Sequence, residues 1–135
     1  MGDAADVALA YFRALSEGDV ETAVSLIADG ADFRSPMGSM SGKDAIRAFL
    51  GGFDSAFPGA HFDVEHTLED GDMVAVEGAY RGVHGGPLTT PGGVLPATGR
   101  SVSAPFVTVF DVAGGQIRSH RPYWDVAGFM AQLTG

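Results

Sequence analysis

The first third of the chain carries apolar side chains at helical spacing. In residues 3–17 an apolar residue recurs at every fourth position, on one face of a helix: Val7, Tyr11 and Leu15. Gly18 ends this pattern, and Asp19 lies where a helix N-cap belongs. Apolar residues at 23–27 then predict a short second helix, and residues 31–34 predict a short strand.

A third helix is predicted after residue 42. Residues 41–44 read Ser-Gly-Lys-Asp, which has the spacing of a capping box. The apolar residues that follow keep a helical period: Ala45, Ile46, Phe49, Leu50 and Phe53. We expect the sequence Phe57-Pro58-Gly59 to end this helix.

Beyond Pro58 the apolar period changes from helical spacing to two. In residues 61–68 every second residue is less polar than its neighbours: Phe62, Val64, His66 and Leu68. This alternation predicts a strand with one buried face. Turns at 70–71 and 113–115 separate three further predicted strands, over residues 73–83, 101–112 and 116–125. Asp125 could then cap a closing helix that carries Phe129, Met130 and Leu133.

The segment from Gly85 to Gly99 is rich in glycine and proline and poor in large apolar residues. Such a composition favours a mobile loop over a strand of a sheet. Because its ends join two predicted strands, we expect it to act as a lid at the mouth of a pocket.

The order of elements predicts an α+β fold. Helices come first and a run of strands follows, which favours an antiparallel sheet with helices on one face. A length of 135 residues with 45 % hydrophobic content suits one domain, over residues 1–135. A strongly twisted sheet wrapped around a helix would leave a cavity.

Composition narrows the classes of function. Seventeen acidic residues against eight basic ones give a net charge of −9, so nucleic acid is not expected as a partner. The absence of cysteine removes disulfides, thiolate metal sites and cysteine nucleophiles. We also find no metal-ligand spacing, no glycine-rich phosphate loop and no Gly-x-Ser-x-Gly elbow, and expect no cofactor, metal or nucleotide. An acidic start and the lack of a long apolar run predict no signal peptide, no membrane association and a cytoplasmic location.

Several stretches resemble a known superfamily. The sequence YFRALSEGD at 11–19 and SGKDAI at 41–46 are similar to the opening of ketosteroid isomerases. The later half resembles SnoaL-like polyketide cyclases, at YRGVHGG (80–86), PATGR (96–100), GQIRSHR (115–121) and MAQL (130–133). This resemblance covers nearly the whole chain. It implies the cone-shaped nuclear-transport-factor-2-like fold, in which a strongly curved antiparallel sheet wraps around N-terminal helices and encloses a pocket. It also implies a homodimer through the open sheet face.

The resemblance maps family catalytic positions onto this chain. Tyr11 matches the oxyanion tyrosine of the isomerases, whose chemistry pairs a base with hydrogen-bond donors; as an alternative it is a core aromatic. The isomerase base falls at Ser35, before Pro36, and the second acid falls near Thr108. The cyclase acid/base aspartate falls at Pro122 and its assisting histidine at or beside Thr108. The family carboxylates are therefore missing, and we expect Ser35 and Thr108 to contact substrate instead.

The last strand supplies the remaining candidates. If position 122 faces the cavity, the two-residue period places His120 and Trp124 on the same face. His120 is then the best proton carrier, because its unperturbed pKa is near neutral; the alternative is a histidine fixed at the pocket edge. We expect Tyr11 and His120 to face one another across the cavity as the catalytic pair.

Further residues are assigned to substrate binding or left with two interpretations. Trp124 would form a pocket wall, or equally pack in the core. His66 interrupts an apolar strand face, and with Phe106 it is expected to contact substrate. His84 and His61 are expected near loops and solvent. Asp125 is either a helix cap, the favoured interpretation, or a displaced acid.

These observations favour a cofactor-independent enzyme that acts on a hydrophobic, polyketide-like or terpenoid-like small molecule. The reaction would be a cyclisation or isomerisation, with epoxide-opening and pericyclic cyclisation included, because orientation in a shaped pocket accelerates a reaction even without a strong base. The alternative is a non-catalytic small-molecule binding domain, which the missing carboxylates favour. A pure scaffold would require a filled cavity.

Overall fold

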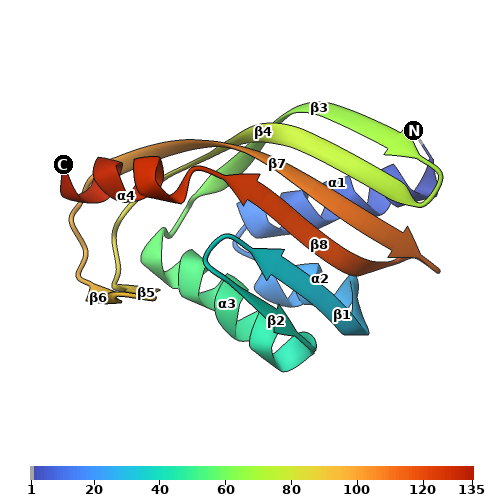
Figure 1. The fold of residues 1–135 in the computed structure, drawn as a ribbon, viewed down its shortest axis with the longest axis horizontal. Helices are drawn as coiled ribbons and strands as arrows, with labels where there is room; N and C mark the ends of the chain where they lie inside the picture. The colour runs from blue at the N-terminus through green and yellow to red at the C-terminus, as the bar shows by residue number, and fades with distance from the viewer. Residues whose placement is uncertain (1) are drawn as a thin grey trace.

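The computed structural model describes residues 2–135. Four helices are present in this range: α1 (Asp3–Ser16), α2 (Val20–Ser25), α3 (Lys43–Ala56) and α4 (Val126–Thr134). The strands are β1 (Ile27–Ser35), β2 (Gly38–Ser41), β3 (His61–Asp70), β4 (Met73–Val83), β5 (Leu88–Thr90), β6 (Gly93–Leu95), β7 (Ser101–Ala113) and β8 (Gln116–Trp124) (Figure 1).

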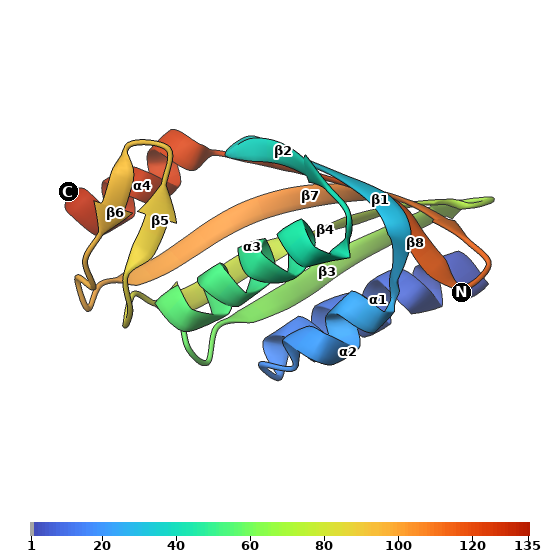
Figure 2. The ribbon, with the colours of Figure 1, turned by 90° about the horizontal axis from the view of Figure 1, so that it is seen from below.

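Six strands form one curved sheet in the order β2-β1-β8-β7-β4-β3. The helices α1, α2 and α3 lie on one side of this sheet, and α4 follows β8 at its end (Figure 2). This is the expected nuclear-transport-factor-2-like α+β fold, and the sheet is not closed. One detail differs from the prediction: β1 pairs with β8 in parallel, while the other pairs of this sheet are antiparallel.

Helix starts follow two of the three predicted caps. The Asp19 carboxylate accepts a hydrogen bond from the Thr22 backbone N–H at 3.0 Å, at the start of α2. Asp125 accepts one from the Gly128 N–H at 2.9 Å, which identifies it as the cap of α4. The capping box predicted for α3 is wrong, because the N-cap is Gly42 and no side chain caps this helix.

A carboxylate from a distant strand caps α1. Glu69 of β3 accepts hydrogen bonds from the backbone N–H of Gly2 at 2.9 Å and of Ala5 at 2.7 Å. These N–H groups have no partner within the helix, and a negative charge at this end is favoured by the helix dipole.

We therefore expect Glu69→Ala to lower the free energy of unfolding by about 1 kcal/mol, the usual effect of losing a cap. Urea titration monitored by circular dichroism measures this loss. The matched control is Glu65→Ala, which removes an exposed glutamate of the same strand that makes no hydrogen bond to α1. An equal loss in both variants would contradict the capping role.

A β-bulge in β3 reverses the predicted faces of its second half. Val64 pairs with Gly78 and His66 with Glu77, so Glu65 is the extra residue. Before the bulge Phe62 faces the core, as predicted, but after it His66 and Leu68 face solvent, and Leu68 is 72 % exposed. The missing side chain of Gly78 allows this geometry, because a Cβ there would lie within 3.0 Å of the Asp63 carbonyl.

The segment 85–99 contains a short hairpin, β5–β6, in place of the irregular loop that its composition predicted. Leu88 is buried against Phe57 and Phe129 in a small core cluster at this end of the molecule. His84 at its base is fully buried, which corrects the expectation of a solvent-exposed histidine. Its Nδ1 accepts a hydrogen bond from the Thr98 N–H at 3.2 Å and holds the two ends of the segment together.

Within residues 2–135, every helix is too short or too polar to cross a lipid bilayer.

Candidate functional site

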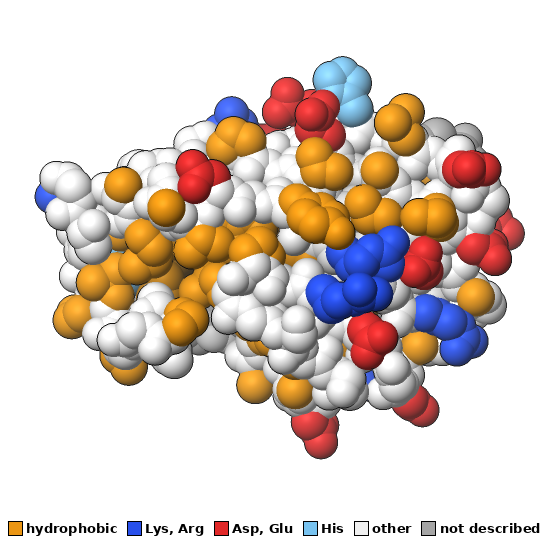
Figure 3. Space-filling model, in the orientation of Figure 1, with side chains coloured by type: hydrophobic (Ala, Val, Ile, Leu, Met, Phe, Trp, Pro, Cys, Tyr) orange, Lys and Arg blue, Asp and Glu red, His pale blue; other side chains and the backbone are white. Residues whose placement is uncertain are grey.

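A cavity of about 120 Å³ lies between the concave face of the sheet and the helices α1 and α3. Aromatic rings dominate its walls: Tyr11, Phe12, Phe49, Phe53, Phe57, Phe62, Tyr80, Phe106, Trp124 and Phe129. Apolar side chains gather around a hollow on the molecular surface between α4 and α3 (Figure 3). The alternation of β4, β7 and β8 places their inward residues on this cavity, while α1 and α3 supply the opposite wall.

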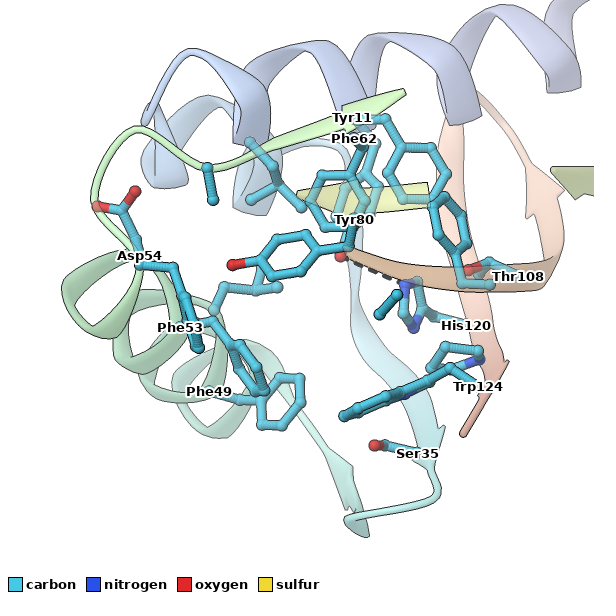
Figure 4. Close-up of a pocket in the computed structure, with 18 of the residues that line it drawn as sticks. Tyr11, Ser35, Phe49, Phe53, Asp54, Phe62, Tyr80, Thr108, His120 and Trp124 are labelled. Atoms are coloured by element: carbon cyan, nitrogen blue, oxygen red, sulfur yellow. Dashed lines mark hydrogen bonds between the residues drawn. The ribbon is translucent and has the colours of Figure 1, made fainter. Parts of the chain in front are cut away.

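The predicted pair Tyr11 and His120 meets inside this cavity (Figure 4). The Tyr11 Oη and His120 Nε2 atoms lie 3.4 Å apart, and both side chains are buried. Direct contact replaces the expected placement on opposite walls. Phe33 stacks on the imidazole with ring centroids 4.1 Å apart, and Phe110 meets its edge at 5.2 Å. The two rings fix the position of His120.

Burial keeps both members of the pair neutral. It lowers the pKa of His120 to about 3, with a smaller contribution from the positive charge of Arg121. It also raises the pKa of Tyr11 well above its usual value. His120 is therefore a neutral imidazole at physiological pH, which corrects the expectation of a proton carrier near neutrality. Its Nδ1 has no hydrogen-bond partner within residues 2–135.

Four other predicted residues also line the cavity. Ser35 and Thr108 bring hydroxyl groups, and the Ser35 Oγ accepts a hydrogen bond from the Met37 N–H at 3.1 Å. Phe106 and Trp124 supply aromatic walls, with Trp124 half-buried and meeting the edge of Phe129.

Two predictions about the site are wrong. His66 lies on the outer face, where its Nδ1 contacts the Glu77 carboxylate at 2.9 Å, because the bulge at Glu65 reverses the strand's faces. Residues 85–99 do not line the cavity. The β5–β6 hairpin packs against α3 instead, so the prediction that this segment acts as a lid is wrong.

Sequence reasoning missed two polar residues of the cavity, Tyr80 and Asp54. Tyr80 was detectable in principle: it lies on the inward face of β4, in register with Phe62 and Ala104 on the neighbouring strands. Asp54 directly follows Phe53, which belongs to the apolar stripe of α3, and no local sequence pattern marks Asp54 as a cavity residue. Among the part of the chain that the structure describes, it is the carboxylate that lines the cavity.

The described residues contain no group of three His, Asp or Glu side chains placed to hold a metal ion.

Solved structures share this fold along almost their whole length. A candidate SnoaL-like polyketide cyclase from Jannaschia sp. CCS1 is 23 % identical, with a TM-score of 0.86 over 98 % of this chain and 92 % of that one. A candidate polyketide cyclase from Xanthomonas campestris is 25 % identical, with a TM-score of 0.83 over 97 % and 96 %. IdmH, a candidate polyketide cyclase from Streptomyces antibioticus, is 25 % identical, with a TM-score of 0.79 over 98 % and 99 %.

Sequence comparison gives the family directly. No curated protein matches the chain significantly. The family model of the SnoaL-like domain matches residues 8–120, which include part of α1, the strands β1 to β7 and His120 of β8. The chain therefore belongs to the SnoaL-like domain family.

Proposed function

We propose that this protein is a cofactor-independent cyclase or isomerase that acts on an unsaturated, polyketide-like or terpenoid-like ketone. The observation that carries the proposal is the neutral Tyr11–His120 pair, 3.4 Å apart at the wall of an aromatic cavity. An oxygen that gains negative charge beside this pair would meet a hydrogen-bond donor in a site of low polarity, where such a bond is worth most.

In this proposal His120 orients the Tyr11 hydroxyl, and Tyr11 donates a hydrogen bond to the ligand. With its proton on Nε2, His120 donates to the Tyr11 Oη, and the phenol hydrogen is free to point at the ligand. When solvent hydroxide removes a proton next to the ligand carbonyl, it becomes water. The C–H electron pair then forms the C=C bond, and the carbonyl π electrons move onto oxygen. Tyr11 stabilises the resulting enolate without losing its own proton.

The cavity limits the size of the ligand. Its volume of about 120 Å³ is that of roughly four molecules of liquid water, at about 30 Å³ each. This is smaller than the roughly 300 Å³ at which ligand pockets usually begin. It suits a compact ligand of one or two rings better than a long chain. The aromatic walls favour a flat, unsaturated body.

Binding of matched ligands tests the polar contact. The chain has one tryptophan, Trp124, which lines the cavity, so quenching of its fluorescence reports binding. We expect β-naphthol to bind about tenfold more tightly than β-methylnaphthalene, because Tyr11 donates to its oxygen. Tyr11→Phe should remove this preference and leave the affinity for β-methylnaphthalene unchanged.

The control is Tyr123→Phe, which removes a hydroxyl from an exposed tyrosine on the outer face of β8. It should keep the full preference for β-naphthol. Equal binding of the two ligands by the unmodified protein, or a preference that survives Tyr11→Phe, would contradict the proposed role of Tyr11.

The missing family carboxylates at Ser35, Thr108 and Pro122 also support a second candidate function, ligand binding without turnover. That function predicts the same preference for β-naphthol but no acceleration of any proton exchange. We also propose a homodimer, because the outer face of the sheet exposes apolar side chains at Leu68, Met73 and Tyr123.

A further inference from the structure

We propose that Tyr80 and Asp54 form a second polar binding site in the cavity, which binds a hydroxyl group at the end of the ligand away from the Tyr11–His120 pair. The inference rests on the proposed function in one respect: an apolar ligand occupies the cavity. It adds a ligand class, namely flat unsaturated molecules with an oxygen at each end.

Tyr80 reaches the cavity from the middle of β4. Its ring packs against Phe62 at 4.9 Å and against Phe57 at 5.9 Å, so its direction is fixed by neighbouring aromatic side chains. Its hydroxyl extends away from Tyr11 and His120, toward α3 (Figure 4). The hydroxyl lines the cavity and makes no hydrogen bond within residues 2–135, so it is open to a ligand.

Asp54 stands at the edge of the cavity on that same side. The side chain is half-buried on the last turns of α3, and its carboxylate lies beside the turn at Gly18. Burial first, and the negative charge of Asp54 second, raise the pKa of Tyr80. Both side chains line this end of the cavity, and they are not hydrogen-bonded to each other.

Tyr80 and Asp54 together offer one hydrogen-bond donor and one acceptor to a hydroxyl group of the ligand. A phenol donates one hydrogen bond, while an ionised carboxylate accepts only. A ligand hydroxyl can satisfy both at once, because it accepts from Tyr80 and donates to Asp54. An ether or ketone could use Tyr80 alone, and a carboxylate on the ligand would be repelled by Asp54. The site therefore selects an alcohol or phenol.

Bisphenols of increasing length test the second site. Hydroquinone, a naphthalenediol with its hydroxyls at opposite ends, and biphenol with both para hydroxyls are each compared with the corresponding mono-phenol. Quenching of Trp124 gives the affinities. We expect at least one bisphenol to bind about tenfold more tightly than its mono-phenol, the gain of one hydrogen bond to a charged acceptor. Tyr80→Phe and Asp54→Asn should each remove most of that gain.

Two controls separate this site from the first. Tyr80→Phe and Asp54→Asn, which remove the bisphenol gain, should keep the preference of β-naphthol over β-methylnaphthalene that Tyr11 provides. Asp44→Asn, which removes a fully exposed carboxylate from the first turn of the same helix, should change neither the preference for β-naphthol nor the bisphenol gain. If the protein prefers β-naphthol but binds no bisphenol more tightly than its mono-phenol, the second site alone is contradicted. A gain that survives Tyr80→Phe and Asp54→Asn would also contradict the second site alone. Failure of every ligand to bind would overturn the second site together with the proposed function.

Discussion

Removal of the Tyr11 hydroxyl, in Tyr11→Phe, is expected to slow the exchange of the α-hydrogens of β-tetralone by on the order of 10²–10³-fold, the usual effect of losing one donor to a developing oxyanion. β-Tetralone is a compact bicyclic ketone, and exchange in deuterated water requires its enolate. Proton magnetic resonance follows the loss of the α-hydrogen signal in the presence of unmodified or substituted protein. The reaction therefore measures enolate stabilisation without knowledge of the natural substrate.

The variant should fold normally, because phenylalanine keeps the edge contacts of Tyr11 with Phe12 and Phe110. Tyr123→Phe serves again as the control for loss of an exposed hydroxyl, with an expected rate equal to that of the unmodified protein. If the unmodified protein does not accelerate exchange although it binds β-naphthol, ligand binding without turnover becomes the better assignment.

Local patterns were sufficient for the inward-facing residues of the last strand. Because side chains alternate in a regular strand, one position that faces the cavity fixes its neighbours two residues away. His120, Pro122 and Trp124 line the cavity accordingly, while Tyr123 is exposed. The same reasoning failed for β3, where the bulge at Glu65 shifts the period by one residue. The cause lies on another strand, at Gly78, whose missing side chain admits the close backbone. Such a cause cannot be found within residues 61–70.

Protonation and polarity at the site depend on contacts between distant segments. The sequence places His120 on a strand, but its pKa depends on burial between Phe33 of β1 and Phe110 of β7. Asp54 becomes a cavity residue because α3 packs across the sheet opposite Tyr80. Neither arrangement has a signal in local spacing, so the sequence predicted the fold and the cavity wall better than the chemical state of the residues on it.

Acid is expected to destabilise the folded protein through His120. The unfolded chain binds a proton at this residue with a pKa of 6.5, whereas burial lowers the folded value to about 3. Between these values the unfolded state holds more protons, so the free energy of unfolding falls as the pH decreases. The stabilisation is fully present above pH 6.5 and disappears toward pH 3. From pH 7 to pH 4 the loss is about 3 kcal/mol.

The contribution of this residue is isolated by His120→Phe, which keeps the stacking on Phe33 and cannot titrate. Carboxylates titrate in the same range and affect both proteins alike, so the informative quantity is the difference between the two free energies of unfolding. Urea titrations at pH 7, 6, 5 and 4 should show this difference moving in favour of His120→Phe, by about 1.4 kcal/mol for each unit of pH below 6. A difference that stays constant from pH 7 to pH 4 would mean that the folded protein admits a proton at His120. The folded pKa of His120 would then lie near 6.5, and the pair would be neutral only above that pH.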